Sequence, residues 1–259
     1  MQNAQSTFAS YPSLKDRVVL ITGGATGIGE AFVTQFARQG SRVAFLDIQD
    51  EQARSLAAAL TGEGCPAPLF IHCDVTEVAA LKAAVAQVVS TYGTVDVLVN
   101  NAANDQRHTI EEVTPESWDR GMAINLRPHF FTVQAVLPAM RAAGRGSIIN
   151  MSSIAWIIPN TTLAVYVAAK AAIVGLTRTL AHDLGPLNIR VNAILPGAIA
   201  TERQKKLWYT PEYLANIFQR QALKHQIEPE EVARLALFLA ADDSRSITNQ
   251  SYVIDAGFV

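Results

Sequence analysis

The chain has 259 residues, of which 49% are hydrophobic and 17% are charged, and its formal net charge is −2. This composition supplies ample material for a core, and it excludes the basic surface with which proteins bind nucleic acids or acidic membranes. The first residues hold no apolar segment typical of a signal peptide, and no apolar stretch approaches the roughly 18 residues of a membrane span. We therefore expect a soluble, cytoplasmic protein whose two cysteines, Cys65 and Cys73, are reduced.

Short apolar runs rich in valine, isoleucine and leucine alternate with longer helical patterns. The expected strands are 18–22, 42–47, 69–73, 97–100, 147–151, 190–195 and 251–254, and the expected helices are 27–39, 52–60, 77–92, 115–140, 162–184 and 229–240. Strands that are apolar throughout are typical of a parallel sheet that helices cover on both faces. The pattern predicts a single α/β domain with a Rossmann-type, doubly wound parallel sheet of about seven strands. Residues 1–13 are expected to form a loose lead-in, and residues 14–259 a dinucleotide-binding and catalytic domain.

The segment TGGATGIG, residues 22–29, follows the first expected strand and opens the first expected helix. Its glycines Gly23, Gly27 and Gly29 permit a sharp turn and the approach of a pyrophosphate to the N–H groups of the helix N-terminus. An ordinary βα loop is the alternative for this spacing alone. Asp47, which ends the second expected strand, lies 18 positions after Gly29. This is close to the spacing of about 20 at which a carboxylate binds ribose hydroxyls and repels a 2′-phosphate. The two features together predict NAD in preference to NADP, unless Asp47 is only a polar strand end.

Polar residues also end the third and fourth expected strands. Asp74 lies in CDV, and the amides of NNAA, residues 100–103, follow the fourth strand. Ligands of open α/β sheets bind at the carboxyl ends of the strands, so these residues are expected beside the cofactor.

The segment MSSIAWIIPNTTLAVYVAAK contains Ser153, Tyr166 and Lys170. Tyr166 and Lys170 are four positions apart on an expected helix and therefore share one face. The Lys170 ammonium is expected to lower the pKa of the Tyr166 phenol, which would make it a general base for an alcohol proton. Ser153 ends the fifth expected strand and is placed to bind the same substrate oxygen. The alternative is a buried tyrosine beside a solvated lysine.

With these motifs in this order, the chain resembles the short-chain dehydrogenases/reductases from about Leu14 to the C-terminus. The resemblance implies an NAD-dependent enzyme acting on CH–OH, with Asn125 of MAINL joining Ser153, Tyr166 and Lys170 as a catalytic residue. Ala103 departs from the glycine that ends the family's NNAG motif. The implied cofactor contacts are Gly23, Thr26, Gly27, Ile28, Gly29, Asp47, Ile48, Asp74, Val75, Asn101, Ala102, Tyr166, Lys170, Pro196, Gly197, Ile199 and Thr201.

Several stretches resemble the bacterial NAD-dependent aldose 1-dehydrogenases of that family, namely YPSLK, NNAANDQRH, RQKKLWYTPE and YVIDAGFV. This resemblance implies oxidation of C1 of a pentose or 6-deoxyhexose to the lactone. The expected substrate contacts are Asn104, Arg107, His108, Ser153, Trp156, Arg203 and Trp208. Their mixture of polar groups and rings suits a neutral sugar, whereas an inward-pointing Arg107 would favour a carboxylate. The alternatives are a secondary-alcohol dehydrogenase of a 2-keto-3-deoxy sugar acid and, from another class, an inactive nucleotide-sensing regulator.

Four further interpretations concern surfaces and packing. Residues 202–225 form either a mobile substrate lid or a fixed pair of surface helices. Pro128 is expected to bend the helix 115–140. The five histidines show no metal-ligand spacing, so no metal site is expected. For Trp156 and His108, the alternative to a substrate contact is a packing role. Apolar and small residues on the helices near 123–140 and 167–184 predict a homotetramer.

Overall fold

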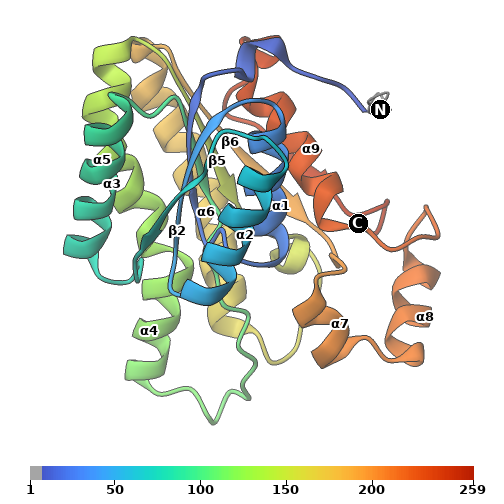
Figure 1. Ribbon diagram of the computed structural model, residues 1–259. Coiled ribbons are helices and arrows are strands. Elements are labelled where there is room, and N and C mark those ends of the chain that lie inside the picture. Colours follow the sequence, from blue (N-terminus) through green and yellow to red (C-terminus); the bar gives the residue numbers. More distant parts are fainter. Residues whose placement is uncertain (1–7) are drawn as a thin grey trace.

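The sheet expected from the apolar runs is present in the computed structural model, which describes residues 8–259 (Figure 1). Within that range seven parallel strands lie in the order β3-β2-β1-β4-β5-β6-β7. The strands are β1 Val18–Thr22, β2 Arg42–Asp47, β3 Leu69–His72, β4 Val97–Asn100, β5 Gly146–Met151, β6 Ile189–Pro196 and β7 Ser251–Ile254. The chain builds β2 and β3 on one side of β1 and then crosses to place β4 on the other side. The strand order reverses there, so a crevice forms at the carboxyl ends of β1 and β4.

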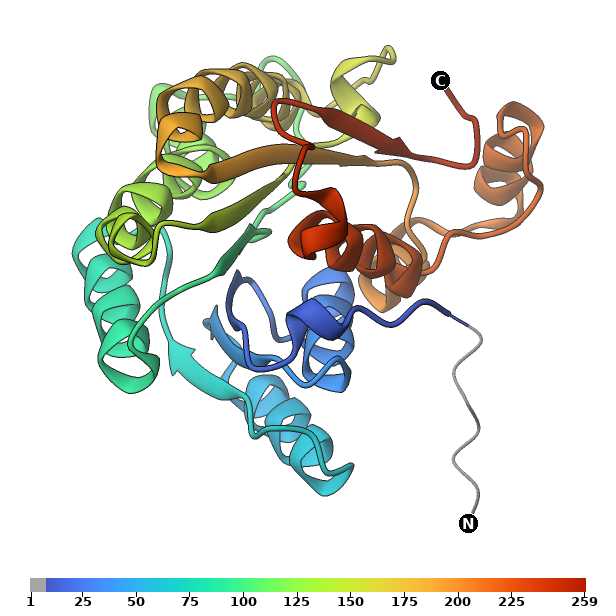
Figure 2. The same ribbon diagram turned by 90° about the horizontal axis from the view of Figure 1, so that it is seen from above.

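Helices cover both faces of the sheet. They are α1 Gly27–Arg38, α2 Asp50–Gly62, α3 Val78–Tyr92, α4 Pro115–Asn125, α5 Arg127–Ala143, α6 Ala164–Leu184, α7 Glu202–Trp208, α8 Pro211–Arg220 and α9 Pro229–Ala240. Seen from above, α1, α2 and α9 lie on one side of the sheet, and α3, α5 and α6 on the other (Figure 2). Successive side chains of β1 point to opposite faces of the sheet. Val19 and Ile21 pack with α1 and α9 on one face, and Val18 and Leu20 pack with α3 and α5 on the other.

The expected single helix over 115–140 is wrong, because the chain breaks at Leu126. That residue has φ −127° and ψ −52°, so α4 ends at Asn125 and α5 begins at Arg127. Pro128 accordingly lies in the first turn of α5, where its missing N–H costs no intrahelical hydrogen bond. The break gives Asn125 a helix C-terminus from which its side chain reaches the loop after β4.

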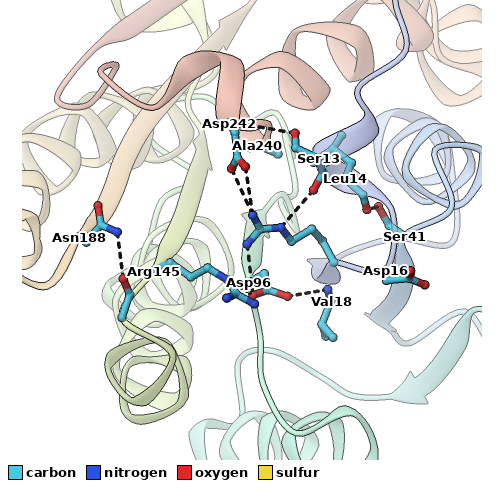
Figure 3. Close-up of polar contacts among 12 residues, drawn as sticks. Ser13, Leu14, Asp16, Val18, Ser41, Asp96, Arg145, Asn188, Ala240 and Asp242 are labelled. Carbon is cyan, nitrogen blue, oxygen red and sulfur yellow. Dashed lines mark hydrogen bonds and ion pairs between the residues drawn. The ribbon is translucent and has the colours of Figure 1, made fainter.

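The amino-terminal edge of the sheet is held by a buried carboxylate, that of Asp96 (Figure 3). It accepts hydrogen bonds from the N–H of Val18 (2.9 Å) and from Nε of Arg145 (2.9 Å). Arg17 donates to Asp242, just beyond α9, and also lies 3.7 Å from Asp96. These contacts join the starts of β1, β4 and β5, at the opposite edge from the crevice.

The expectation that no segment is long and apolar enough for a membrane span is wrong for the helix that carries Tyr166. Ala164–Leu187 reaches the required length and hydropathy. This is weak evidence for a span, because a core helix satisfies the same criterion. Val165, Ala169, Ile173 and Leu180 are buried against the rest of the chain, as in a core helix.

Of the expected lead-in, residues 1–7 lie outside the described residues. Farther along, Pro12–Leu14 forms a short 3-10 helix, and the Leu14 side chain is fully buried in the core beside α1. The N–H of Tyr11 donates to Oε1 of Gln39 (2.8 Å). This stretch is therefore attached to the end of α1.

Candidate active site

The turn between β1 and α1 is closed too tightly for side chains. Gly23 has φ +66°, and its N–H donates to the Leu46 carbonyl (2.7 Å). A Cβ on Gly29 would lie 1.7 Å from the Gly23 carbonyl oxygen. Thr26, at the N-cap of α1, makes no side-chain hydrogen bond to the helix. The backbone of the first turn is therefore open to an anion, as the pyrophosphate of a dinucleotide requires.

Asp47 links the end of β2 to this turn. Its buried carboxylate accepts from the N–H of Ala25 (2.9 Å) through Oδ2, and from Ile48 (2.8 Å) and Gln49 (3.0 Å) through Oδ1. Ile48 is exposed. The position next to the turn thus holds a fixed negative charge followed by two uncharged side chains.

The NNAA segment lies against the same turn. Nδ2 of Asn101 donates to the carbonyls of Gly23 (2.8 Å) and Thr22 (3.1 Å). Cα of Ala102 would be 2.8 Å from a Cβ on Gly23. Asn100 points into the sheet instead, where its Nδ2 donates to Oδ1 of Asn150 (3.0 Å). The two amides therefore have different surroundings, and only Asn101 borders the crevice.

Two other expected cofactor segments flank the crevice. Asp74 follows β3, and its Oδ1 accepts from the N–H of Thr76 (2.9 Å). On the other side, the methyl group of Thr201 would lie 3.3 Å from a Cβ on Gly27. Ile199, just before it, forms a bridge with Ile227. The segment after β6 is thereby held against the glycine-rich turn.

Ser153, Tyr166 and Lys170 converge at the carboxyl end of β5. The Ser153 hydroxyl faces the phenol of Tyr166 and lowers its pKa, and it also accepts from the N–H of Ala155 (3.0 Å). Nζ of Lys170 lies 5.4 Å from the centre of the Tyr166 ring and donates to the Met151 carbonyl (2.7 Å). The lysine side chain is only 1% exposed. The three side chains expected to act together therefore do lie together.

The pKa of the Tyr166 phenol is raised, whereas the sequence predicted a lowered value. Burial raises the pKa of the Tyr166 phenol to about 12, the nearby Asp105 carboxylate raises it further, and the Ser153 hydrogen bond lowers it. Burial also lowers the pKa of Lys170 to about 7. Both changes have one cause, since loss of water disfavours the charged form of each group. The spacing of the two residues indicated proximity but not the cost of desolvation.

Asn125 fixes the loop that follows β4. Its Oδ1 accepts from the N–H of Asn104 (2.8 Å), and its Nδ2 donates to the carbonyls of Asn104 (3.0 Å) and Gly121 (3.0 Å). The side chain is 2% exposed. Asn125 thus holds both backbone groups of Asn104 and sets the course of the residues after it.

Residues expected to contact substrate come from this loop and from α7. The guanidinium of Arg107 stacks 4.0 Å from the centre of the Trp208 ring, and Arg203 donates to Asp105. The backbone N–H of His108 donates to the carbonyl of Thr162 (2.9 Å). Trp156 is more than one-third exposed, on the short 3-10 helix Ile154–Trp156 that follows Ser153. Arg107, Arg203 and Trp208 are therefore close together, whereas Trp156 belongs to another segment.

Two residues near the catalytic group were not expected there. Asp105, in the loop after β4, also accepts from Nε2 of Gln204 (2.8 Å). An acid directly after NNAAN, at the carboxyl edge of a strand, was the available signal. His129, expected at the surface or in packing, is fully buried, and burial together with the charge of Lys170 lowers its pKa to about 3. Its ring is therefore neutral near pH 7, and no sequence pattern indicated this burial.

A glycine-rich turn at the switch point of a parallel sheet, with a serine, a tyrosine and a lysine at the next carboxyl edge, defines a nucleotide-binding oxidoreductase. Residues 23–259 match the family model described as enoyl-(acyl carrier protein) reductase. The chain belongs to the short-chain dehydrogenase/reductase family, whose dehydrogenases use NAD or NADP, and it is an oxidoreductase that acts on CH–OH groups.

Similar proteins cover nearly the whole chain. A probable galactose dehydrogenase of Rhizobium meliloti is 49% identical over 249 residues, which are 96% of this chain and 97% of that protein. The D-xylose 1-dehydrogenase of Caulobacter vibrioides is 49% identical over 250 residues, covering 96% and 98%. A 3-oxoacyl-[acyl-carrier protein] reductase of Brucella melitensis, solved with bound NAD, is 35% identical with a TM-score of 0.87, covering 96% and 94%.

Proposed function

We propose that this protein is a cytoplasmic, NAD-dependent sugar dehydrogenase that oxidises C1 of an aldose, a pentose or 6-deoxyhexose, to the lactone. One observation carries the choice of a neutral sugar: Arg203, the arginine of α7 that reaches the loop after β4, is already paired with the Asp105 carboxylate. A carboxylate substrate would require a free bidentate arginine. The names of the two relatives that are 49% identical, a galactose and a D-xylose dehydrogenase, support the same substrate class.

The residues around the crevice fit NAD. The β1–α1 turn would hold the pyrophosphate, Asp47 the adenosine ribose, and Asp74 with Val75 the adenine. On the nicotinamide side, the contacts would come from Asn101, Ala102 and the segment 196–201. When bound, NAD accepts the hydride and brings the positive charge of its ring to the site.

Residues of the protein would orient the sugar hydroxyl and accept its proton. Ser153 would orient the sugar hydroxyl, and the Tyr166 phenolate would accept its proton. Lys170 would bind the nicotinamide ribose, and its ammonium would favour the phenolate against the opposing effect of burial. Asn125 would keep the loop after β4 in place beside them.

The NAD preference makes a direct prediction for Asp47. Asp47→Asn keeps an oxygen that can accept from the Ala25 N–H but removes the charge that would face a 2′-phosphate. The ratio of kcat/KM with NAD to that with NADP should be large in the natural protein and should fall in the variant. Equal values for the two cofactors in the natural protein would contradict the assignment.

A substrate panel tests the proposal as a whole. D-xylose, L-arabinose, L-fucose, L-rhamnose and D-galactose would be compared with 2-keto-3-deoxy sugar acids at matched concentrations, with NADH absorbance as the readout. We expect turnover of the aldoses. Turnover of the acids alone, lost in Arg107→Ala, would establish the sugar-acid alternative. No turnover of any compound in the panel would favour the nucleotide-sensing regulator.

A further inference from the structure

Asp105 occupies a place between the catalytic residues and α7. It follows Asn104, whose backbone is held on both sides by Asn125. Its side chain is 21% exposed, and its two oxygens accept from different residues of α7, Arg203 and Gln204. A chain of hydrogen bonds thus runs from Asn125 through the loop to the helix of the expected lid.

We propose that Asp105 is a specificity-determining residue: it fastens α7 over the site and makes the site select uncharged sugars against substrates that bear a carboxylate. This inference deepens the proposed function and rests on it.

The contacts between the loop after β4 and α7 support the proposed attachment of this helix. Arg107, two residues further along the same loop, stacks on Trp208 at the end of α7. The loop therefore contacts both ends of this seven-residue helix, Arg203 near its start and Trp208 at its end. Thr201 caps α7 by accepting from the N–H of Gln204 (3.2 Å), and Thr201 itself lies beside the glycine-rich turn. Any change at Asp105 is thus transmitted to a helix that borders both the cofactor crevice and the substrate side.

The negative charge of Asp105 supports the proposed selectivity against carboxylate substrates. The groups that face the Tyr166 phenol are the Ser153 hydroxyl from the end of β5, Lys170 from the same helix, and Asp105 from the loop after β4. His108 also approaches the start of this helix, with its Nε2 3.5 Å from the N–H of Val165. Asp105 is the acid among them. It can accept hydrogen bonds from sugar hydroxyls, whereas a substrate carboxylate would be repelled by it and would find Arg203 already paired.

Two substitutions distinguish the effect of the Asp105 charge from its role in attaching α7 to the loop. Asp105→Asn and Arg203→Gln both break the same ion pair, but they change the local charge in opposite senses. Asp105→Asn removes a negative charge near Tyr166, so the alkaline rise of kcat/KM for aldose oxidation should move to lower pH. Arg203→Gln leaves Asp105 without its cation, so the rise should move to higher pH. At a fixed pH on the rising limb, we expect a change of roughly threefold or more in each direction.

The selectivity is measured on the same proteins. Asp105→Asn should lower the ratio of kcat/KM for the best aldose to that for a 2-keto-3-deoxy sugar acid by roughly tenfold. Glu202→Gln is the matched control: it removes a carboxylate from the same helix, but Glu202 is 93% exposed and pairs with Lys205. This control should leave both the ratio and the pH profile unchanged.

The outcomes separate this inference from the proposed function. If the natural protein oxidises aldoses and the two variants shift the profile in opposite directions, the inference holds. If it oxidises aldoses but both variants shift the profile the same way, or the ratio does not change, Asp105 is only an attachment point and the inference is overturned. If the natural protein oxidises only sugar acids, the proposed function fails and the inference fails with it.

Discussion

The Tyr166 phenol and the Lys170 ammonium are both withdrawn from water, and this acts on their pKa values in opposite directions. It raises that of the phenol to about 12 and lowers that of the ammonium to about 7. The pair therefore disfavours the charged forms that proton abstraction from an alcohol requires. At the scale of single residues, the chain provides the right groups but leaves the phenol neutral and the lysine only partly protonated near neutral pH.

The first prediction is a pH dependence. Because the general base is the deprotonated phenol and its pKa is raised, the active fraction of Tyr166 grows with pH. We expect kcat/KM for sugar oxidation to rise steadily from about pH 7 to about pH 10, with initial rates of NADH formation as the measurement. A profile that is flat over this range would show that Tyr166 is not the base.

A substitution at the same residue is the second prediction. Tyr166→Phe keeps the ring and removes the hydroxyl, so turnover should fall roughly 10²- to 10⁴-fold while NADH binding stays nearly the same. NADH fluorescence titration and initial rates measure the two properties separately. The control is Tyr92→Phe on α3, a helix that covers one face of the sheet. This variant should behave like the natural protein. Near-normal turnover in Tyr166→Phe would disprove the assignment.

At the scale of elements, the β1–α1 turn is the part of the site that leaves least room for change. Its backbone passes so close to itself at Gly29 that a Cβ would lie 1.7 Å from the Gly23 carbonyl oxygen. Asn101, directly after the neighbouring strand β4, donates one hydrogen bond to the same carbonyl. The turn, the loop after β4 and Asp47 therefore form one rigid wall of the crevice.

Gly29→Ala should therefore damage both stability and cofactor binding. The clash involves backbone that cannot move aside, so we expect a loss of about 1–3 kcal/mol in the free energy of unfolding and a strong loss of NADH affinity. Gly62→Ala at the end of α2 is the matched control, because its Cβ would meet no atom within 4 Å. In a helix this exchange should stabilise by about 0.5–1 kcal/mol. Urea unfolding and NADH titration check both variants, and equal behaviour of the two would contradict the account.

The elements also show how far the sequence allows prediction. The structure confirms the predicted bounds of β1, β2, β4, β7 and α9 to the residue. Each of these four apolar strands ends at a polar residue or directly before one, and α9 begins at a proline. The break between α4 and α5 was not predicted, since it depends on the conformation of Leu126 and on Asn125 reaching Asn104. In the site, the motif residues were predicted from their spacing. The role of Asp105 and the burial of His129 were not, because both depend on contacts between distant segments.

At the scale of the whole molecule, one face of α6 is unusual for a monomer. Ala171, Ala172 and Gly175 are exposed on this helix, and a Cβ on Gly175 would contact nothing in the chain. Phe130, on α5, is 44% exposed. Small exposed residues allow close approach of a helix from another copy, which supports the prediction of a homotetramer.

Light scattering tests this prediction. We expect a mass about four times that of the 28.0 kDa chain. Gly175→Glu should dissociate the assembly without unfolding the subunit, because the fold leaves space for the new side chain whereas a neighbouring copy would not. Gly175→Ala should dissociate it less. A mass near 28.0 kDa for the natural protein would rule out the oligomer.

The most direct test of the central claim follows one hydrogen atom. An aldose labelled with deuterium at C1, D-xylose first, would be oxidised with NAD, and both products would be examined by NMR. If the protein oxidises C1, the deuterium leaves the sugar and appears at C4 of the reduced nicotinamide. The sugar product is then the lactone. Formation of NADH with the deuterium retained in the sugar would show that another carbon is oxidised, and the aldose 1-dehydrogenase account would be wrong.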